Sequence, residues 1–136
     1  ETCLHDVIIQ DMKKITGMTV YESPDKLWQQ AIRKEDGSSN PDAIQVISPY
    51  RGEFYGTGAL NTLMQNDFNP YWSSRYNLDG ISYFDKVIQF RNRPKSDMAY
   101  AYNQETRTTE QHEVFNGEIG LVLMHPFDPR ISVINI

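Results

Sequence analysis

The sequence has little of what several protein classes require. It holds one cysteine, Cys3, in 136 residues, which excludes an intramolecular disulfide and a cysteine-based metal cluster. We interpret Cys3 as a bystander near a terminus and not as a catalytic thiol. No apolar run approaches the roughly 18 residues that a membrane span needs. We therefore expect a cytoplasmic protein without membrane contact. Because the chain opens at Glu1 with neither an initiator methionine nor an apolar leader, we expect a piece of a larger protein.

An excess of basic charge is also lacking, since the net charge is −5. A dominant nucleic-acid-binding surface usually appears as a basic excess. The exception is local: Lys86, Arg91, Arg93 and Lys95 fall within ten residues, with only Asp85 against them. A nucleic-acid contact is therefore expected at this segment and not over the whole surface.

Catalytic and metal-binding patterns are missing as well. The three histidines, His5, His112 and His125, are far apart and lack ligand spacing, which argues against a metal site. No nucleophile, base and orienting residue can be assembled from the sequence. The phosphate-binding pattern G-x-x-x-x-G-K-[ST] does not occur, so nothing in the chain is expected to wrap the phosphates of ATP.

Helical periodicity marks the first half of the chain. Apolar residues at three- and four-residue spacing predict a helix over 4–15, ended by Gly17. Ser23-Pro24 predicts a second helix start, because serine caps free N–H groups and proline fits the first turn. The remaining predictions are a short strand at 18–21, a second helix that stops near Gly37, a loop at 36–41, a buried strand at 43–47, a loop at 51–56 and a helix from Thr57 or Gly58.

The pattern of the second half predicts mainly short strands. We predict irregular chain at 69–74 and a strand over 84–91. The polar stretch 94–111 is predicted to be a long loop or an inserted hairpin through 99–102. Asn116-Gly117 predicts a tight turn. Two further strands are expected at 119–124 and 131–136, so that four short strands suggest a small barrel and the whole chain an α+β protein.

Three segments carry a family resemblance when they are taken together and in order. They read Gln45-Val46-Ile47-Ser48-Pro49-Tyr50-Arg51-Gly52 with a following Gly-Thr and Leu-Asn, then Asp85-Lys86-Val87-Ile88-Gln89 with Asn92, then Val114-Phe115-Asn116-Gly117-Glu118-Ile119-Gly120. The set resembles superfamily 1 DNA helicases of the RecD-like (exonuclease V alpha-subunit) and conjugative-relaxase type. There the segments read QVLSPMRRG, GDKVMQ with a later N, and VFNGDIG.

The resemblance implies a domain organisation. Residues 1–80 would be helices plus a strand-loop-helix piece of the second RecA-like motor domain, and residues 81–136 would be the SH3-like β-barrel inserted into it. The implied function is a share in guiding single-stranded DNA and separating strands, within an ATP-dependent helicase of DNA repair or recombination. The implied partners are single-stranded DNA and the remaining motor domains, and an exposed sheet edge in such a piece would favour self-association.

The chain departs from the family pattern in several places. Phe84 stands where the family usually has glycine before Asp-Lys-Val, one residue of the usual basic pair near Arg51 is missing, and the insert between the two barrel signatures is longer. The phosphate-binding loop, the Asp-Glu pair that holds magnesium and the late T-x-H-K-x-Q-G element do not occur. ATP and Mg²⁺ are therefore expected in the parent protein and no cofactor in this piece, which by itself is expected to be inactive as an ATPase.

The resemblance implies one phosphate-binding set, Arg51, Gly52 and Thr57. Arg51 carries a planar five-donor guanidinium that suits a phosphate of ATP or DNA, and glycines such as Gly52 permit close backbone approach. The alternatives are that Arg51 pairs with Glu53 and that the glycines only shape a turn.

A second implied set would contact DNA: Lys86, Arg91, Asn92, Arg93, Lys95 and Asn116. The cations would neutralise single-strand phosphates, and the rings of Phe90, Tyr100 and Tyr102 would offer stacking faces to bases. The alternatives are a solvated strand end with Phe90 in the barrel core, and asparagines that only complete turns.

A different class of function stays open beside the helicase hypothesis. SH3-like barrels often bind peptides through aromatic grooves, and the chain holds 8 tyrosines. A protein-interaction module with no DNA role is therefore the alternative, because a fold does not determine a function.

Overall fold

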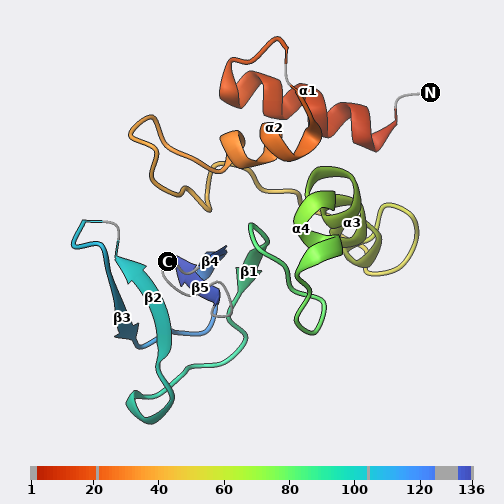
Figure 1. Cartoon of the computed structure of the whole chain (residues 1–136). Coiled ribbons are helices and arrows are strands. Elements are labelled where there is room, and N and C mark those ends of the chain that lie inside the picture. The colour runs from red at the N-terminus through yellow and green to blue at the C-terminus, as the bar shows by residue number, and fades with distance from the viewer. Residues whose placement is uncertain (1–2, 21, 104, 125–131, 136) are drawn as a thin grey trace.

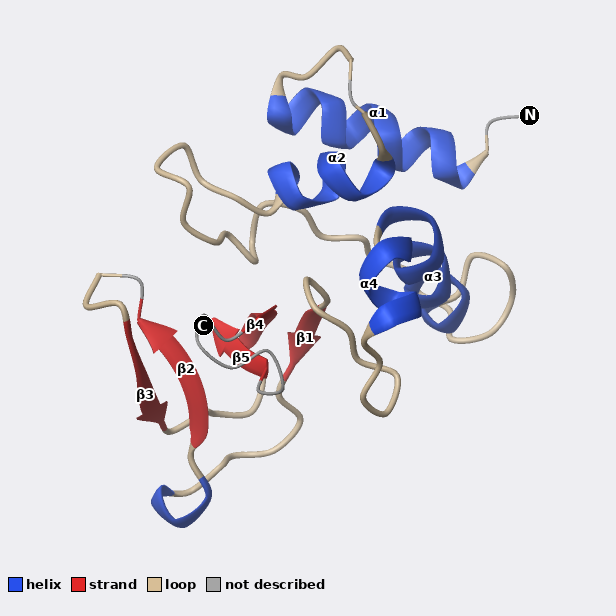
Figure 2. Cartoon of the chain, viewed as in Figure 1, coloured by secondary structure: helices blue, strands red, loops and turns tan. Residues whose placement is uncertain are grey.

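The computed structural model describes residues 3–20, 22–103, 105–124 and 132–135. Figures 1 and 2 show the α-helices gathered at one end of the molecule and the strands at the other. The helical elements are α1 (Leu4–Thr16), α2 (Pro24–Ala31), α3 (Thr57–Leu63), the π-helical turn η1 (Met64–Phe68), α4 (Pro70–Arg75) and the 3₁₀ turn η2 (Lys95–Asp97). The strands are β1 (Lys86–Ile88), β2 (Ala99–Asn103), β3 (Thr108–His112), β4 (Ile119–Met124) and β5 (Ser132–Asn135).

Helices α1 and α2 confirm the expectations from periodicity and capping. α1 ends at Thr16, directly before Gly17, and buries Ile8, Ile9 and Met12. At the start of α2, the Ser23 hydroxyl accepts a hydrogen bond from the Lys26 N–H at 3.3 Å. α2 ends at Ala31, six residues before Gly37, so the predicted length was too great.

Three local predictions are wrong. The buried strand predicted at 43–47 is absent, and Ile47 is 80% exposed, because no strand in the described fold pairs with this segment. Residues 18–20 form no strand either, and Tyr21 lies outside the described residues. The segment 69–74 is not irregular but contains most of α4, whose start is marked by a proline at its first position.

The strands form two antiparallel sheets within the described residues. One has the order β1-β4-β5 and the other is the hairpin β2-β3. Of the two alternatives for 94–111, the structure has the hairpin through 99–102. β4 and β5 confirm the strands predicted at 119–124 and 131–136, of which Ile131 and Ile136 lie outside the described residues. Helices plus small antiparallel sheets establish the α+β class. The described ladders do not join the two sheets into a closed barrel.

One apolar core connects the helical end to the strands. Its buried members come from α1, α2, η1 and β4, and they are Ile8, Ile9, Met12, Leu27, Trp28, Ala31, Ile32, Phe68 and Leu121. The indole N–H of Trp28 donates to the Phe84 carbonyl at 3.0 Å. The segment that follows Phe84 is therefore held against the helices at its start, and its far end extends away from them (Figure 1).

Among the described residues, no helix is long and apolar enough to cross a membrane.

Candidate nucleic-acid interface

Two of the three motif segments pair with each other in the fold. β1 and β4 form a regular ladder that ends at Ile88 opposite Ile119. The pairing resumes in the same register at Arg93 opposite Val114, which lie five residues further along each segment. Between these points the two backbones separate. The motif segments around residues 84–93 and 114–121 are therefore one long ladder with an interruption at its centre.

A β-bulge begins the interruption. The Gln89 N–H donates to the Glu118 carbonyl at 3.0 Å, while the Gly117 N–H donates to the Gln89 carbonyl at 2.8 Å. Two residues, Gly117 and Glu118, therefore face one residue, Gln89. Gly117 has a φ of +93°, which matches the bulge type whose first residue is a left-handed glycine. The predicted turn at Asn116-Gly117 is present, but it belongs to this bulge and does not join two strands as a hairpin.

A side chain replaces the missing ladder bond on the far side of the bulge. The Asn116 N–H donates to the side-chain oxygen of Asn92 at 2.8 Å. The carboxylate of Glu118 accepts from the Phe115 N–H at 2.9 Å. Both contacts satisfy backbone donors that the interruption would leave unpaired. The interruption is thus a fixed conformation held from both sides.

Each of the two segments carries one exposed phenylalanine at this interruption. Phe90 is 82% exposed and Phe115 is 53% exposed. We call Phe90, Arg91, Phe115 and Asn116 the platform. The interpretation that placed Phe90 in a barrel core is wrong. Large exposed rings on a fixed backbone are the side chains on which single-stranded bases stack.

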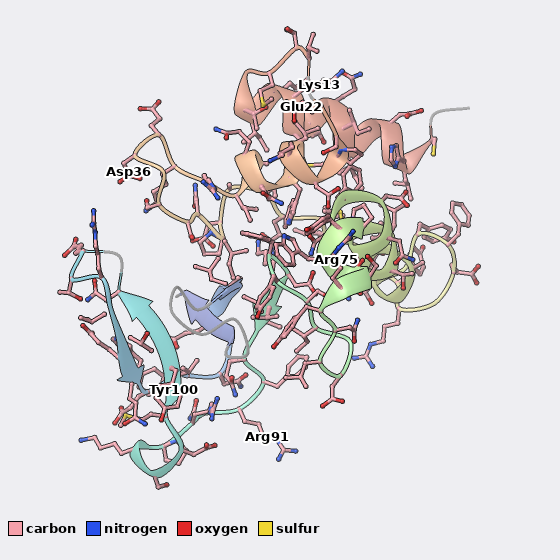
Figure 3. All side chains as sticks on the ribbon, in the orientation of Figure 1. Lys13, Glu22, Asp36, Arg75, Arg91 and Tyr100 are labelled. Carbon is pink, nitrogen blue, oxygen red and sulfur yellow. The ribbon has the colours of Figure 1, made fainter. Side chains whose placement is uncertain are left out.

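The cations next to the platform differ in how they are held. Arg91 is exposed and has no ion pair within the described part of the chain, and Figure 3 shows its side chain projecting away from the ribbon between β1 and β2. The Arg93 guanidinium contacts the Asp97 carboxylate at 2.8 Å. Lys95 lies 3.9 Å from a carboxylate oxygen of Glu113. Of Arg91, Arg93 and Lys95, only Arg91 therefore presents a charge that no described acidic side chain offsets.

Lys86 lies elsewhere. Its ammonium donates to the carbonyl of Ile44 at 2.9 Å, so that it ties β1 to the segment that follows α2. Burial lowers the pKa of Lys86 below the usual value for lysine, and the nearby charge of Asp42 opposes that shift. The structure thus separates Lys86 from the other predicted DNA-binding cations and gives it a positioning role between the two halves.

Asp85 is a further residue of the same motif whose contacts sequence reasoning did not anticipate. Its carboxylate accepts from the Gln65 amide at 2.5 Å, the Ser82 N–H at 2.9 Å and the Asn69 amide at 3.2 Å. These donors come from η1, from its C-terminal end and from the turn before β1. The Asp-Lys pair at 85–86 therefore anchors the start of β1 to η1 and its C-cap, and to the non-helical segment that follows α2.

The predicted phosphate-binding set shares one loop, which closes on itself. The Thr57 N–H donates to the Tyr50 carbonyl at 2.9 Å, and the Gly58 N–H donates to the Arg51 carbonyl at 3.4 Å. These donors at the start of α3 are thus occupied, and α3 has only seven residues. Arg51 is exposed, and it makes no ion pair with Glu53 in the described structure. The arrangement therefore provides a solvent-facing guanidinium but no backbone cradle for the phosphates of ATP.

The close backbone approach in this loop falls at a glycine other than Gly52. A Cβ on Gly56 would lie 2.6 Å from the Arg51 carbonyl oxygen, and closer still to that of Gly52, whereas a Cβ on Gly52 would meet open space. Gly56 is required by the loop itself and not by a ligand. The loop lies beyond α3, at the opposite end of the molecule from the hairpin β2-β3 (Figure 1).

Phe84 adopts a backbone conformation that is unusual for its residue type. Its φ is +67°, in the left-handed region that favours glycine. Its carbonyl accepts the Trp28 indole N–H, and its own N–H donates to the Val122 carbonyl at 2.7 Å. The position where the resembled family has glycine is therefore one at which this backbone favours glycine.

An apolar pocket of about 220 Å³ lies beside the interruption. Its lining residues come from the turn after α4, from β1 and from β4, and include Leu78, Ile81, Val87, Ile88, Ile119 and Val122. Gln89 and Glu118 line it too, so the pocket borders the bulge. This pocket was not foreseen from the sequence: Asp79-Gly80 is a strong signal for the turn that pairs Leu78 with Ile81, but the approach of that turn to β1 and β4 is a tertiary contact.

Sequence reasoning also missed Phe115, Asp97 and Glu113 as neighbours of the cations and rings. Asp97 lies four residues after Arg93, but the two do not share a helix, so the i, i+4 rule for helices gave no signal here. Of the other predicted stacking residues, Tyr100 is exposed on β2, and the side chain of Tyr102 lies outside what the structure describes. His125 is likewise outside the described residues.

No protein-family model, curated protein or solved structure matches this chain. Within the described residues, no group of three or more histidine, cysteine, aspartate or glutamate side chains is arranged to hold a metal ion.

Proposed function

We propose that this chain is a segment of an ATP-dependent DNA helicase and that its strand region guides single-stranded DNA over the platform. ATP, Mg²⁺ and the remaining motor domains belong to the parent protein. The segment contributes to strand separation by holding one strand and does not itself hydrolyse ATP. The observation that carries the proposal is the interrupted ladder, which joins the two motif segments and exposes Phe90 and Phe115 beside Arg91.

The chemistry of the platform supports a single strand as its ligand. Every base has a π-face, so exposed phenyl rings bind bases without regard to sequence, with about 1 to 3 kcal/mol for each stacked base. A neighbouring cation such as Arg91 attracts the phosphates. Because the net charge of the chain is −5, this attraction acts locally, and the rest of the surface does not add to it.

The conformation of Phe84 gives separate support. The motif match rests on residue types, whereas the φ of +67° is a property of the folded backbone. The resembled family has glycine at this position, and the backbone of this chain favours glycine there. These two observations are independent and point to the same backbone conformation.

The test is binding of a fluorescent single-stranded oligonucleotide, measured by anisotropy at low and moderate salt. The variants Phe90→Ala and Phe115→Ala each remove one ring, and Arg91→Gln removes the exposed charge. We expect each aromatic variant to weaken binding by about 1 kcal/mol or more. Arg91→Gln should reduce the dependence of the affinity on salt.

Phe54→Ala is the matched control. Phe54 is 76% exposed, close to the exposure of Phe90, but it lies in the loop beyond α3, away from the strands (Figure 1). Its removal should leave the affinity unchanged. The proposal would be contradicted if the unaltered chain did not bind at low salt, or if its affinity did not fall at moderate salt. An equal loss of affinity in Phe90→Ala, Phe115→Ala and Phe54→Ala would also contradict it.

A protein-interaction module is the second candidate, and the apolar pocket favours it. Ile81 and Ile88 line the pocket and remain about half exposed, as a groove for an apolar peptide side chain requires. Ile88→Lys would abolish peptide binding at this pocket while leaving the platform rings in place. A partner captured by the unaltered chain after nuclease treatment, and lost with Ile88→Lys, would favour this candidate over DNA guidance.

A further inference from the structure

The Arg93 side chain is engaged by a single residue through two donors. Its Nε donates to the backbone carbonyl of Asp97 at 2.9 Å, and its Nη2 donates to the Asp97 carboxylate at 2.8 Å. Two neighbouring donors on two acceptor oxygens is also the geometry with which a guanidinium binds a phosphate. Asp97 is part of the short turn η2 and its side chain is 67% exposed. Its carboxylate is thus within reach of a competing ligand.

The position of Arg93 places this pair at the edge of the platform. The Arg93 N–H donates to the Val114 carbonyl at 2.7 Å, which restores the ladder directly after the interruption. Arg93 is thereby two residues from Arg91 and opposite the residue that precedes Phe115. A single DNA strand that stacks on the platform rings and runs from Arg91 toward higher residue numbers reaches Arg93 next.

We infer that Arg93 binds a backbone phosphate of the single strand, and that Asp97 occupies its donors as an internal stand-in for that phosphate until the strand arrives. This inference rests on the proposed function and adds to it a named phosphate-binding residue and an intramolecular competitor. Lys95, at 3.9 Å from Glu113, is held less closely and follows Arg93 along the same path.

Charge and exposure make the exchange feasible. The hydrogen bond and the charge of Arg93 lower the pKa of the Asp97 carboxyl below its usual value, so the carboxylate stays ionised near neutral pH and competes by charge. Exposed ion pairs of this kind shift an equilibrium by roughly fivefold or less. A phosphate carrying a full negative charge and additional stacking contacts therefore displaces it.

The test uses the same anisotropy titration with Asp97→Asn, which keeps the shape of the side chain and removes its charge. We expect single-stranded DNA to bind roughly two- to fivefold tighter to this variant than to the unaltered chain. The slope of log affinity against log salt should stay nearly the same, because Arg93 contacts the same single phosphate in both proteins.

Two comparisons separate this exchange from a general effect of charge. Glu105→Gln removes one exposed carboxylate from the β2-β3 turn, where its side chain has no partner among the described residues, and should give no comparable gain. Arg93→Gln should bind more weakly than the unaltered chain. Adding Asp97→Asn to Arg93→Gln should then bring no improvement, because the competitor no longer has a guanidinium to occupy.

The outcomes distinguish this inference from the function on which it rests. If the unaltered chain binds and loses affinity with Phe90→Ala, but Asp97→Asn matches Glu105→Gln, the platform stands and the stand-in role of Asp97 is wrong. If the gain from Asp97→Asn persists with Arg93→Gln, Arg93 is not the phosphate-binding residue. If no form binds single-stranded DNA, both the function and this inference are overturned.

Discussion

The side-chain oxygen of Asn92 accepts a hydrogen bond from the backbone N–H of Asn116 at 2.8 Å, across 24 positions of the chain. The two asparagines come from the two motif segments whose order carried the family resemblance. The bond replaces a ladder bond at the interruption and fixes the turn that presents Phe115. Asn92 therefore acts through Asn116 as a positioning residue for the platform.

We predict that Asn92→Ala lowers the free energy of unfolding by about 1 kcal/mol, because it removes the acceptor of one hydrogen bond and leaves the Asn116 N–H without a partner in the chain. Asn92→Asp keeps an oxygen at the same place and should retain most of the stability. Urea denaturation followed by circular dichroism gives both values. Asn61→Ala, on the exposed side of α3, is the control and should change stability by less than about 0.5 kcal/mol. Equal effects of Asn92→Ala and Asn61→Ala would contradict the role of the bond.

The left-handed backbone of Phe84 leads to a prediction with an unusual sign. At an ordinary strand or helix position, glycine is about 0.5 to 1 kcal/mol less stable than alanine. At a φ of +67° the order should reverse, because alanine pays the steric cost of the left-handed region. We predict that Phe84→Gly is more stable than Phe84→Ala by about 1 kcal/mol, although both lose the packing of the ring beside Trp72. Denaturant unfolding of the two variants is the measurement, and alanine more stable than glycine would show that the backbone there is not left-handed.

The hydrogen bond from Trp28 to the Phe84 carbonyl tests whether helices and strands unfold together. Trp28→Phe keeps an aromatic ring in the core and removes the only indole donor to that carbonyl, so we predict a loss of about 1 to 3 kcal/mol. Because the bond joins α2 to the chain before β1, the loss should appear in one transition that includes the β-sheet signal. Two separate transitions, with the strand signal unmoved, would show that the halves fold independently.

Local signals explain which parts of the fold were predictable. α1 and α2 follow from apolar spacing and from the Ser23-Pro24 start, since both depend on residues within one or two turns. The predicted strand at 43–47 failed because a strand is defined by a neighbour that supplies its hydrogen bonds, and the described fold places none beside Ile47. β4 was predicted correctly because its own residues are continuously apolar and its partners, β1 and β5, are present.

In the candidate site, too, the local features were predictable from the sequence and the tertiary contacts were not. The clustering of Arg91, Arg93 and Lys95 was visible in the sequence, and so was the Asn-Gly turn. What each cation contacts was not, because the partners Asp97 and Glu113 and the carbonyl of Ile44 are reached through tertiary contacts whose distances no spacing rule gives. Phe90 is exposed on the same side as Ile88, as the alternation of a strand requires, but the sequence does not show that this side faces solvent and not a core.

Lys86 gives a prediction for alkaline pH. Burial holds its pKa in the folded protein below 10.5, the usual value for a lysine. Between the lowered pKa and 10.5, the unfolded chain retains a proton that the folded chain has released, so the contribution of Lys86 to stability rises with pH in that window. Below the window the lysine is protonated in both states and its contribution is constant. We predict that the stability of the unaltered chain relative to Lys86→Met increases as pH rises toward 10.5, measured by urea unfolding of both proteins at each pH. Titration of the other groups cancels in the difference, and Lys34→Met, on the exposed surface, is the control for removing a lysine.

The same Lys86→Met variant should bind single-stranded DNA as the unaltered chain does, because the ammonium of Lys86 contacts Ile44 and not the platform. A loss of affinity as large as that of Arg91→Gln would show that Lys86 contacts the DNA.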